Sequence, residues 1–161
     1  MEPRIELLPP KKLIGKHVTM SLLQDRTLEL WQGFMPIRKL VQNTIGKDLY
    51  CLQVYEPGFV FSGYTPDTVF EKWAAIEVTG FTTAPPGGMD NFELPGGLYA
   101  VFPYKGRAAD FKDTFMYIYY TWMPKSGYEV DHRPHFEVLG EKYKNNDPES
   151  EEDIWVPIKK K

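Results

Sequence analysis

Glu137 is a carboxylate in a stretch where carboxylates are costly. It lies between Phe136 and Val138 in an apolar, extended segment near the C-terminal end of the chain. An unpaired buried carboxylate costs several kcal/mol, so Glu137 must be paired, hydrogen-bonded, protonated or matched by a ligand. The alternative is a half-exposed strand on which Glu137 simply faces water.

Glu77 offers a second carboxylate, next to a large ring. Side chains alternate along a strand, so Glu77 shares one face of its predicted strand with Trp73 and Ala75. The small alanine leaves room for a planar, cationic ligand to stack on the ring and pair with the carboxylate. A solvated charge at a sheet edge is the alternative. In an enzyme, Glu137 and Glu77 would be the catalytic candidates, because a glutamate of raised pKa can deprotonate a water.

Aromatic residues that could line a binding pocket are abundant. They make up 15% of the 161 residues, with ten Phe, ten Tyr and four Trp. Tyr and Trp combine an apolar body with a polar group, which suits a ligand site as well as a core. The candidates for ring walls are Trp31, Tyr55, Trp73, Phe92, Tyr117 and Trp122. Each of them could instead be a core residue.

Metal, cofactor and nucleophile chemistry has little support. Asp131, His132 and His135 are metal-ligand types, but Pro134 forces an extended backbone, in which positions three apart face opposite ways. The sequence has no phosphate-binding GxxxxGK[ST], no Rossmann glycine fingerprint, no HExxH and no CxxC. A Ser or Cys triad with His also lacks local support. We therefore expect no metal and no cofactor.

Charge and cysteine content narrow the class of protein. A net charge of −3 argues against a nucleic-acid-binding surface. The single cysteine, Cys51, excludes an internal disulfide framework and fits a reducing, cytoplasmic setting. There is no apolar signal region and no run of membrane-spanning length. These features predict a cytoplasmic protein with no membrane and no direct nucleic-acid partner.

Two helices are predicted to position these side chains, over Asp25–Thr44 and Ala108–Met123. Apolar residues recur at i, i+4, i+7 and i+11 in both, with a constant offset between the two sets: Leu30, Phe34, Ile37 and Val41, then Phe111, Phe115, Ile118 and Trp122. Pro36 should kink or divide the first helix. Pro124 and Gly127 should end the second.

Strand-like runs surround both helices. They cover Leu13–Met20, Leu49–Tyr55, Val69–Thr79, Leu98–Tyr104, the stretch around Glu137 and Ile154–Ile158. The Pro85-Pro86-Gly87-Gly88 loop divides the chain, as one domain over 1–161, into halves at about 5–80 and 91–160. Each half reads as strand, helix, strand, strand, which predicts an α+β fold with a duplicated βαββ module. Two amphipathic helices that share a spacing by chance are the alternative.

Several segments resemble the GyrI-like small-molecule-binding domains. They are GGLYAVFPYKG, TWMPKSGYEV, PHFEVL and DIWVPIKK, with WQGFMP and FEKWAAIEV similar to stand-alone members. The same domain type is the effector-binding module of AraC-type and MerR-type multidrug-responsive regulators. The resemblance spans about 5–160 and implies a curved antiparallel sheet with two helices around a pocket near a pseudo-twofold axis. It also implies a pocket glutamate, which falls on Glu137. Family strands often continue with a tyrosine, whereas Val138 follows here, so no tyrosine role is carried over.

The resemblance and the residues together favour a binding module. The expected function is a stand-alone effector- or drug-binding protein that holds a hydrophobic aromatic molecule, cationic or neutral, beside a glutamate. One alternative is a hydrolase, since some GyrI-like proteins hydrolyse strained cyclopropane-bearing toxins. Another is an inhibitory protein that binds gyrase or a regulator. Only about a dozen residues precede the first long strand, too few for a helix-turn-helix.

Overall fold

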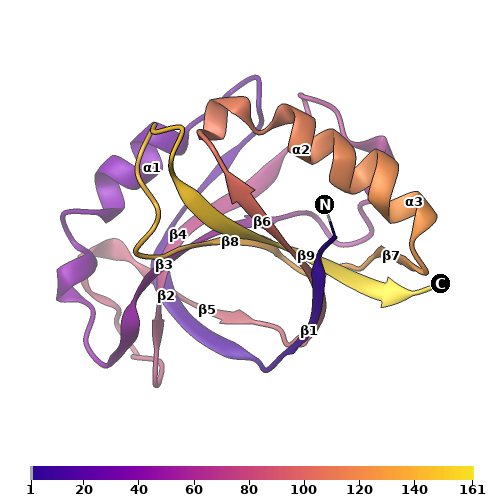
Figure 1. The fold of residues 1–161 in the computed structure, drawn as a ribbon. Helices are drawn as coiled ribbons and strands as arrows, with labels where there is room; N and C mark the ends of the chain where they lie inside the picture. Colours follow the sequence, from indigo (N-terminus) through magenta and orange to yellow (C-terminus); the bar gives the residue numbers. More distant parts are fainter. Residues whose placement is uncertain (1) are drawn as a thin grey trace.

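The computed structural model describes residues 2–161, which fold into a curled sheet with helices on one side (Figure 1). The strands are β1 Arg4–Leu8, β2 Lys11–Met20, β3 Thr44–Val54, β4 Phe70–Val78, β5 Asp90–Leu94, β6 Gly97–Lys105, β7 Tyr128–Val130, β8 His135–Leu139 and β9 Glu151–Lys160. The α-helices are α1 Thr27–Phe34, α2 Lys112–Met116 and α3 Met123–Lys125. Single 3₁₀ turns cover Arg38–Leu40, Phe61–Gly63, Pro86–Gly88 and Ala108–Asp110.

The strand order shows a repeated module. The sheet runs β1-β6-β9-β8-β3-β4-β2-β5, with β7 added beside β9, and every pairing is antiparallel. The first half contributes β2, α1, β3 and β4, and the second contributes β6, α2 to α3, β8 and β9. The two halves meet where β3 pairs with β8. The predicted α+β class, with two βαββ modules in one antiparallel sheet, is therefore confirmed.

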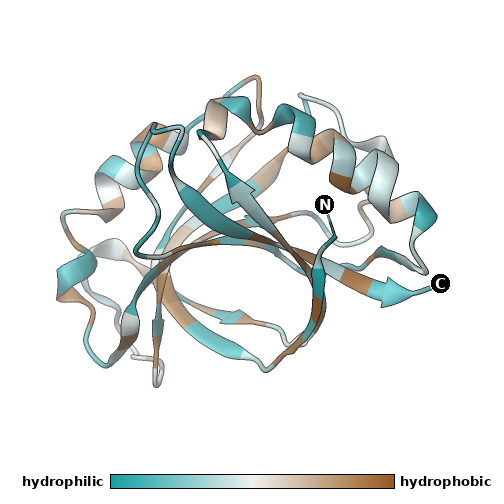
Figure 2. Cartoon of the chain, viewed as in Figure 1, coloured by the Kyte–Doolittle hydropathy of each residue, from teal (hydrophilic) through white to brown (hydrophobic). Residues whose placement is uncertain are grey.

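The two faces of the sheet carry different clusters of side chains. On the inner face of the curl, Leu52, Phe136 and Trp155 pack together with residues from both halves. On the other face, which we call the helix face, α1 covers one apolar cluster through Leu30 and Phe34. The second helical segment covers a separate cluster there. Figure 2 shows hydrophobic and hydrophilic residues interspersed along the strands, as expected for a sheet whose successive side chains point to opposite faces.

The first helix is shorter than its apolar spacing predicted. α1 ends at Phe34, and only the 3₁₀ turn Arg38–Leu40 follows before β3 begins at Thr44. Pro36 divides the segment, as predicted, because it lacks the amide donor and crowds the preceding turn. The prediction of helix as far as Thr44 was wrong.

The second helical segment is continuous from Ala108 to Lys125, close to its predicted bounds. Its middle, Tyr117–Trp122, is a π-helical turn, which apolar spacing does not reveal. Pro124 does not end the helix at its own position. It lies within α3, in the last turn of the segment, and the chain leaves the helix at Ser126.

Candidate functional site

Strand register gathers polar side chains on the helix face between its two apolar clusters. Leu52 pairs with Phe136 where β3 meets β8, and both side chains lie in the inner-face cluster. Their neighbours therefore point to the helix face, because side chains alternate along a strand. These neighbours are Cys51, Gln53, His135 and Glu137.

The flanking strands add two more charged side chains to this group. On β4, Lys72 pairs with Gln53 and precedes the inner-face Trp73. On β9, Ile154 pairs with Glu137, and Glu152 lies two residues away on the same face. We call this group the polar strip: Cys51, Gln53, Lys72, His135, Glu137 and Glu152.

Glu137 is partly buried in the strip and has a perturbed pKa. Gln53 Nε2 donates a hydrogen bond to Glu137 Oε1 at 3.5 Å. Burial raises the pKa of Glu137 to about 7, against the opposing effects of Lys72 and of the Gln53 hydrogen bond. The upward direction of this pKa is the one expected for a carboxylate among apolar neighbours. Near neutral pH, Glu137 is therefore present in both protonation states.

Glu152 and Lys72 complete the charge pattern. Burial and the charge of Glu137 raise the pKa of Glu152 to about 7. Burial lowers the pKa of Lys72, but the acidic groups around it, Glu137 and Glu152 included, reverse this and raise it. Lys72 Nζ donates to Thr27 Oγ1 at 3.1 Å. The strip thus holds one lysine that keeps its charge and two carboxylates that titrate near neutrality.

A cluster of rings adjoins one end of the polar strip. The members of this aromatic cluster are Tyr55, Phe59, Phe61, Tyr64, Phe115, Tyr119 and His135. Phe61 stacks on Tyr119 with ring centroids 4.3 Å apart and on His135 at 5.0 Å. After burial, the charge of Glu137 is among the causes that raise the pKa of Tyr55 and of Tyr119. Glu137 is therefore close enough to act on the rings electrostatically.

His135 joins the polar strip to the aromatic cluster. Its Nδ1 shares a hydrogen bond of 2.8 Å with Tyr119 Oη. Burial, followed by the charge of Arg133, lowers the pKa of His135 to about 3, so the ring is neutral at physiological pH. His135 therefore presents a neutral, flat surface to its neighbours.

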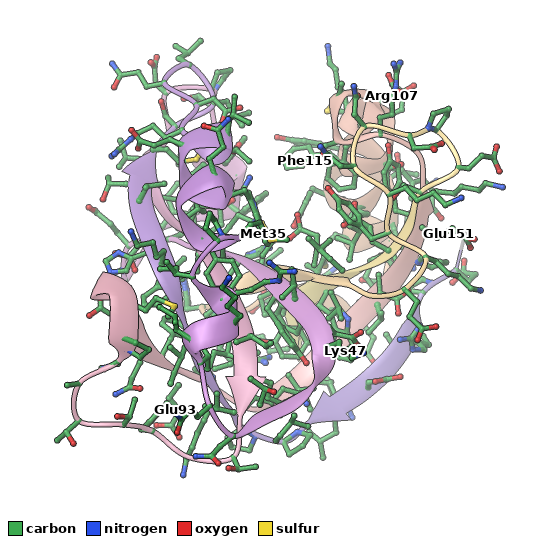
Figure 3. All side chains as sticks on the ribbon, turned by 90° about the vertical axis from the view of Figure 1, so that its left-hand side faces the viewer. Met35, Lys47, Glu93, Arg107, Phe115 and Glu151 are labelled. Carbon is green, nitrogen blue, oxygen red and sulfur yellow. The ribbon has the colours of Figure 1, made fainter. Side chains whose placement is uncertain are left out.

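A hollow of about 660 Å³ borders the same rings. It is lined by residues 54–62 and 129–135 together with Lys159, and it shares Tyr55, Phe59, Phe61 and His135 with the aromatic cluster. Its volume falls within the range of small-molecule sites, roughly 300–1,000 Å³. Met35, just after α1, and Phe115 of α2 come from the two helical segments, which stand on the same side of the sheet (Figure 3).

Three of the residues expected from the sequence lie on the helix face near this site. Glu137 is in the strip, Tyr55 is in the aromatic cluster, and Trp31 of α1 lies beside Cys51. Tyr117 and Trp122 instead pack in the apolar cluster under the second helical segment, where the ring centroids of Trp122 and Phe102 are 5.2 Å apart.

The other expected residues lie on the inner face. Glu77 Oε1 accepts from Lys11 Nζ at 3.2 Å and from Tyr50 Oη at 3.4 Å. Trp73 stacks on His17 with centroids 4.3 Å apart, and the ring centroid of Phe92 lies 4.8 Å from that of Trp73. The structure therefore does not bring Glu77, Trp73 and Phe92 together with Glu137.

Sequence reasoning missed several residues of the site, above all Lys72, Glu152 and Tyr119. Their convergence depends on cross-strand register and on the packing of the second helical segment against β8. One signal was present, because Gln53 and Glu137 occupy equivalent positions in the two βαββ modules. Within residues 2–161, no group of three or more His, Cys, Asp or Glu is placed to hold a metal ion, and no helix is long and apolar enough to cross a membrane.

The curled antiparallel sheet carries, on its helix face, a partly buried carboxylate near a cluster of rings. The chain belongs to the family described as the GyrI-like small molecule binding domain, whose model matches residues 1–159.

Individual relatives are more distant. The transcriptional regulator BrlR of Pseudomonas aeruginosa is 26% identical over 160 residues, which are 98% of this chain but only 56% of BrlR. The structure of SAV2435 bound to tetraphenylphosphonium matches with a TM-score of 0.70 at 21% identity, over 99% of this chain and 94% of the other. A hydrolase from Listeria innocua has a TM-score of 0.63 at 11% identity, over 98% of this chain and 92% of the other. At these identities the two structures show a shared fold alone.

Proposed function

We propose that this chain binds a cationic aromatic small molecule at the polar strip and the aromatic cluster. The observation that carries the proposal is the position of Glu137, a partly buried carboxylate on the same face as a cluster of seven stacked or edge-on rings. The SAV2435 structure, with its lipophilic aromatic cation, supports this ligand chemistry.

The aromatic cluster and the polar strip would contribute different interactions to binding. Ring faces attract a cation and bury the apolar surface of an aromatic ligand, and each good aromatic contact adds about 1 kcal/mol beyond area burial. The Glu137 carboxylate supplies charge selectivity, because an ion pair is stronger in a site shielded from water than at a surface. Ionised Glu137 then gains the partner that its apolar surroundings lack.

Tetraphenylphosphonium is the probe that tests this proposal, since it is aromatic, permanently charged and free of titratable groups. Calorimetric titration of the full chain should show saturable binding, and Glu137→Gln should weaken it roughly tenfold or more. Glu77→Gln is the matched control, because Glu77 lies on the inner face and should leave the affinity unchanged. Equal affinity in wild type and Glu137→Gln would overturn the proposal.

Hydrolysis is a second candidate function at the same residue. The pKa of about 7 suits Glu137 to take a proton from a water that opens a strained ring. Such an enzyme would form product in excess over protein and lose turnover in Glu137→Gln. If the ligand binds and no product forms, the hydrolase function is excluded and only the ligand-binding function remains.

A further inference from the structure

Lys72 is the one feature of the polar strip that a site for a simple cation would not need. An ammonium carries three N–H donors, and Thr27 Oγ1 is the acceptor that Lys72 Nζ uses, at 3.1 Å. No carboxylate among residues 2–161 lies within 4.0 Å of this nitrogen. Lys72 therefore has donor capacity left on the helix face.

An ion pair that stabilises the fold does not account for Lys72. Thr27 begins α1, and the N-terminal end of a helix carries partial positive charge, which disfavours a neighbouring cation. Burial disfavours an ammonium, and the charges of Glu137, Asp25 and Glu152 outweigh that effect without any of them lying within 4.0 Å. Lys72 therefore keeps its charge without a close partner that would occupy its remaining donors.

The position of Lys72 would also oppose the proposed ligand if that ligand carried only a positive charge. β4 and β8 both flank β3, where Lys72 lies opposite His135, and Glu137 is two residues further along β8, so the backbones at Lys72 and Glu137 are roughly 12 Å apart. Two like charges in one partly shielded site repel each other. Opposite charges at the two ends of one molecule would instead satisfy Glu137 and Lys72 together.

We propose that Lys72 determines specificity, so that the site takes an aromatic molecule carrying both a cationic group and an anionic or strong acceptor group. This inference rests on the proposed function. The cationic end lies at Glu137 beside the aromatic cluster, and the acceptor end takes the unused N–H donors of Lys72. Glu152 adds a second carboxylate, which keeps the strip from carrying excess positive charge.

A pair of xanthene dyes distinguishes a site that also binds an acidic group from a site that binds only a cation. A rhodamine with a free carboxylate and its ethyl ester share rings and cation and differ only in the acidic group, and tetraphenylphosphonium has no acceptor at all. Fluorescence anisotropy and calorimetry would give the affinities of the full chain and of Lys72→Met, which keeps the aliphatic stem. We expect Lys72→Met to weaken the carboxylate dye about tenfold and to leave the ester and tetraphenylphosphonium unchanged or tighter.

Three further variants make the outcome of the test unambiguous. Lys72→Arg should retain the preference for the carboxylate dye, and Lys72→Gln replaces Lys72→Met if the latter does not fold. Lys112→Met, on the exposed side of α2, should change nothing. An unchanged ratio of the acid and ester affinities in Lys72→Met overturns the inference while the Glu137 proposal stands. Failure of wild type to bind any of the three probes overturns both.

Discussion

At the scale of single residues, neighbours rather than residue type give the site its chemistry. Glu137 and Glu77 both lie in strands of mixed polarity, yet Glu77 is paired with Lys11 at 3.2 Å, whereas Glu137 has a glutamine at 3.5 Å and a pKa raised to about 7. The sequence alone could place both carboxylates among apolar residues. Which of them lacks a close cation depends on cross-strand neighbours.

The raised pKa of Glu137 predicts a pH-dependent gain in stability for Glu137→Gln. Because the pKa in the folded state is about 7 against 4.5 for the free group, ionising Glu137 costs more in the folded protein. This cost is absent below about pH 4.5 and grows as the pH rises to 7. Removing the charge should therefore leave stability nearly unchanged at pH 4.5 and improve it by about 1–3 kcal/mol at pH 7, because one pKa unit corresponds to about 1.4 kcal/mol.

Denaturant unfolding of wild type and Glu137→Gln between pH 4.5 and 7.5 measures this difference. Glu152→Gln provides a comparison, because the pKa of Glu152 is raised to about 7 in the same strip. A loss of stability in Glu137→Gln at pH 7 would instead identify Glu137 as a structural ion-pair residue.

At the scale of elements, the sequence predicted what depends on local periodicity. Apolar spacing located both helices, and Pro36 marked where the first would divide. The π-helical turn Tyr117–Trp122 was not predictable in this way, because apolar spacing does not distinguish a π-helical turn from an α-helical one. Tyr119 of that turn contacts His135 of β8, and this pairing of distant elements cannot be predicted from each element taken alone.

The bond between Tyr119 and His135 should make a measurable contribution to stability. Tyr119→Phe keeps the ring in the aromatic cluster but leaves the Nδ1 of a buried, neutral histidine without its 2.8 Å partner. Losing one partner of a buried hydrogen bond typically costs about 1–3 kcal/mol. Urea unfolding should show a loss of stability in that range for Tyr119→Phe. Tyr120→Phe should show almost no loss, because Tyr120 is 50% exposed. Equal effects of the two substitutions would contradict this assignment.

At the scale of the whole molecule, the duplicated βαββ module explains why the site lies where it does. The halves join through β3 and β8, so the strip between the two helix-covered clusters runs along the join. The repeat, visible in the sequence as a constant offset between two apolar sets, predicted this sheet and its two helices. It did not predict that Glu77, Trp73 and Phe92 face the inside of the curl, because the face of a strand is settled only by its partners.

The face at which an aromatic cation binds is the most direct test of the account, and the tryptophans report it. Trp31 lies on the helix face beside Cys51, whereas Trp73 and Trp155 belong to the inner-face cluster. Indole N–H signals in nuclear magnetic resonance spectra, assigned through single Trp→Phe variants, distinguish these positions during a titration with tetraphenylphosphonium. We predict saturable shifts of the Trp31 signal, lost in Glu137→Gln, with the Trp73 and Trp155 signals nearly constant. Shifts of Trp73 and Trp155 without a shift of Trp31 would place the ligand inside the curl and contradict the account.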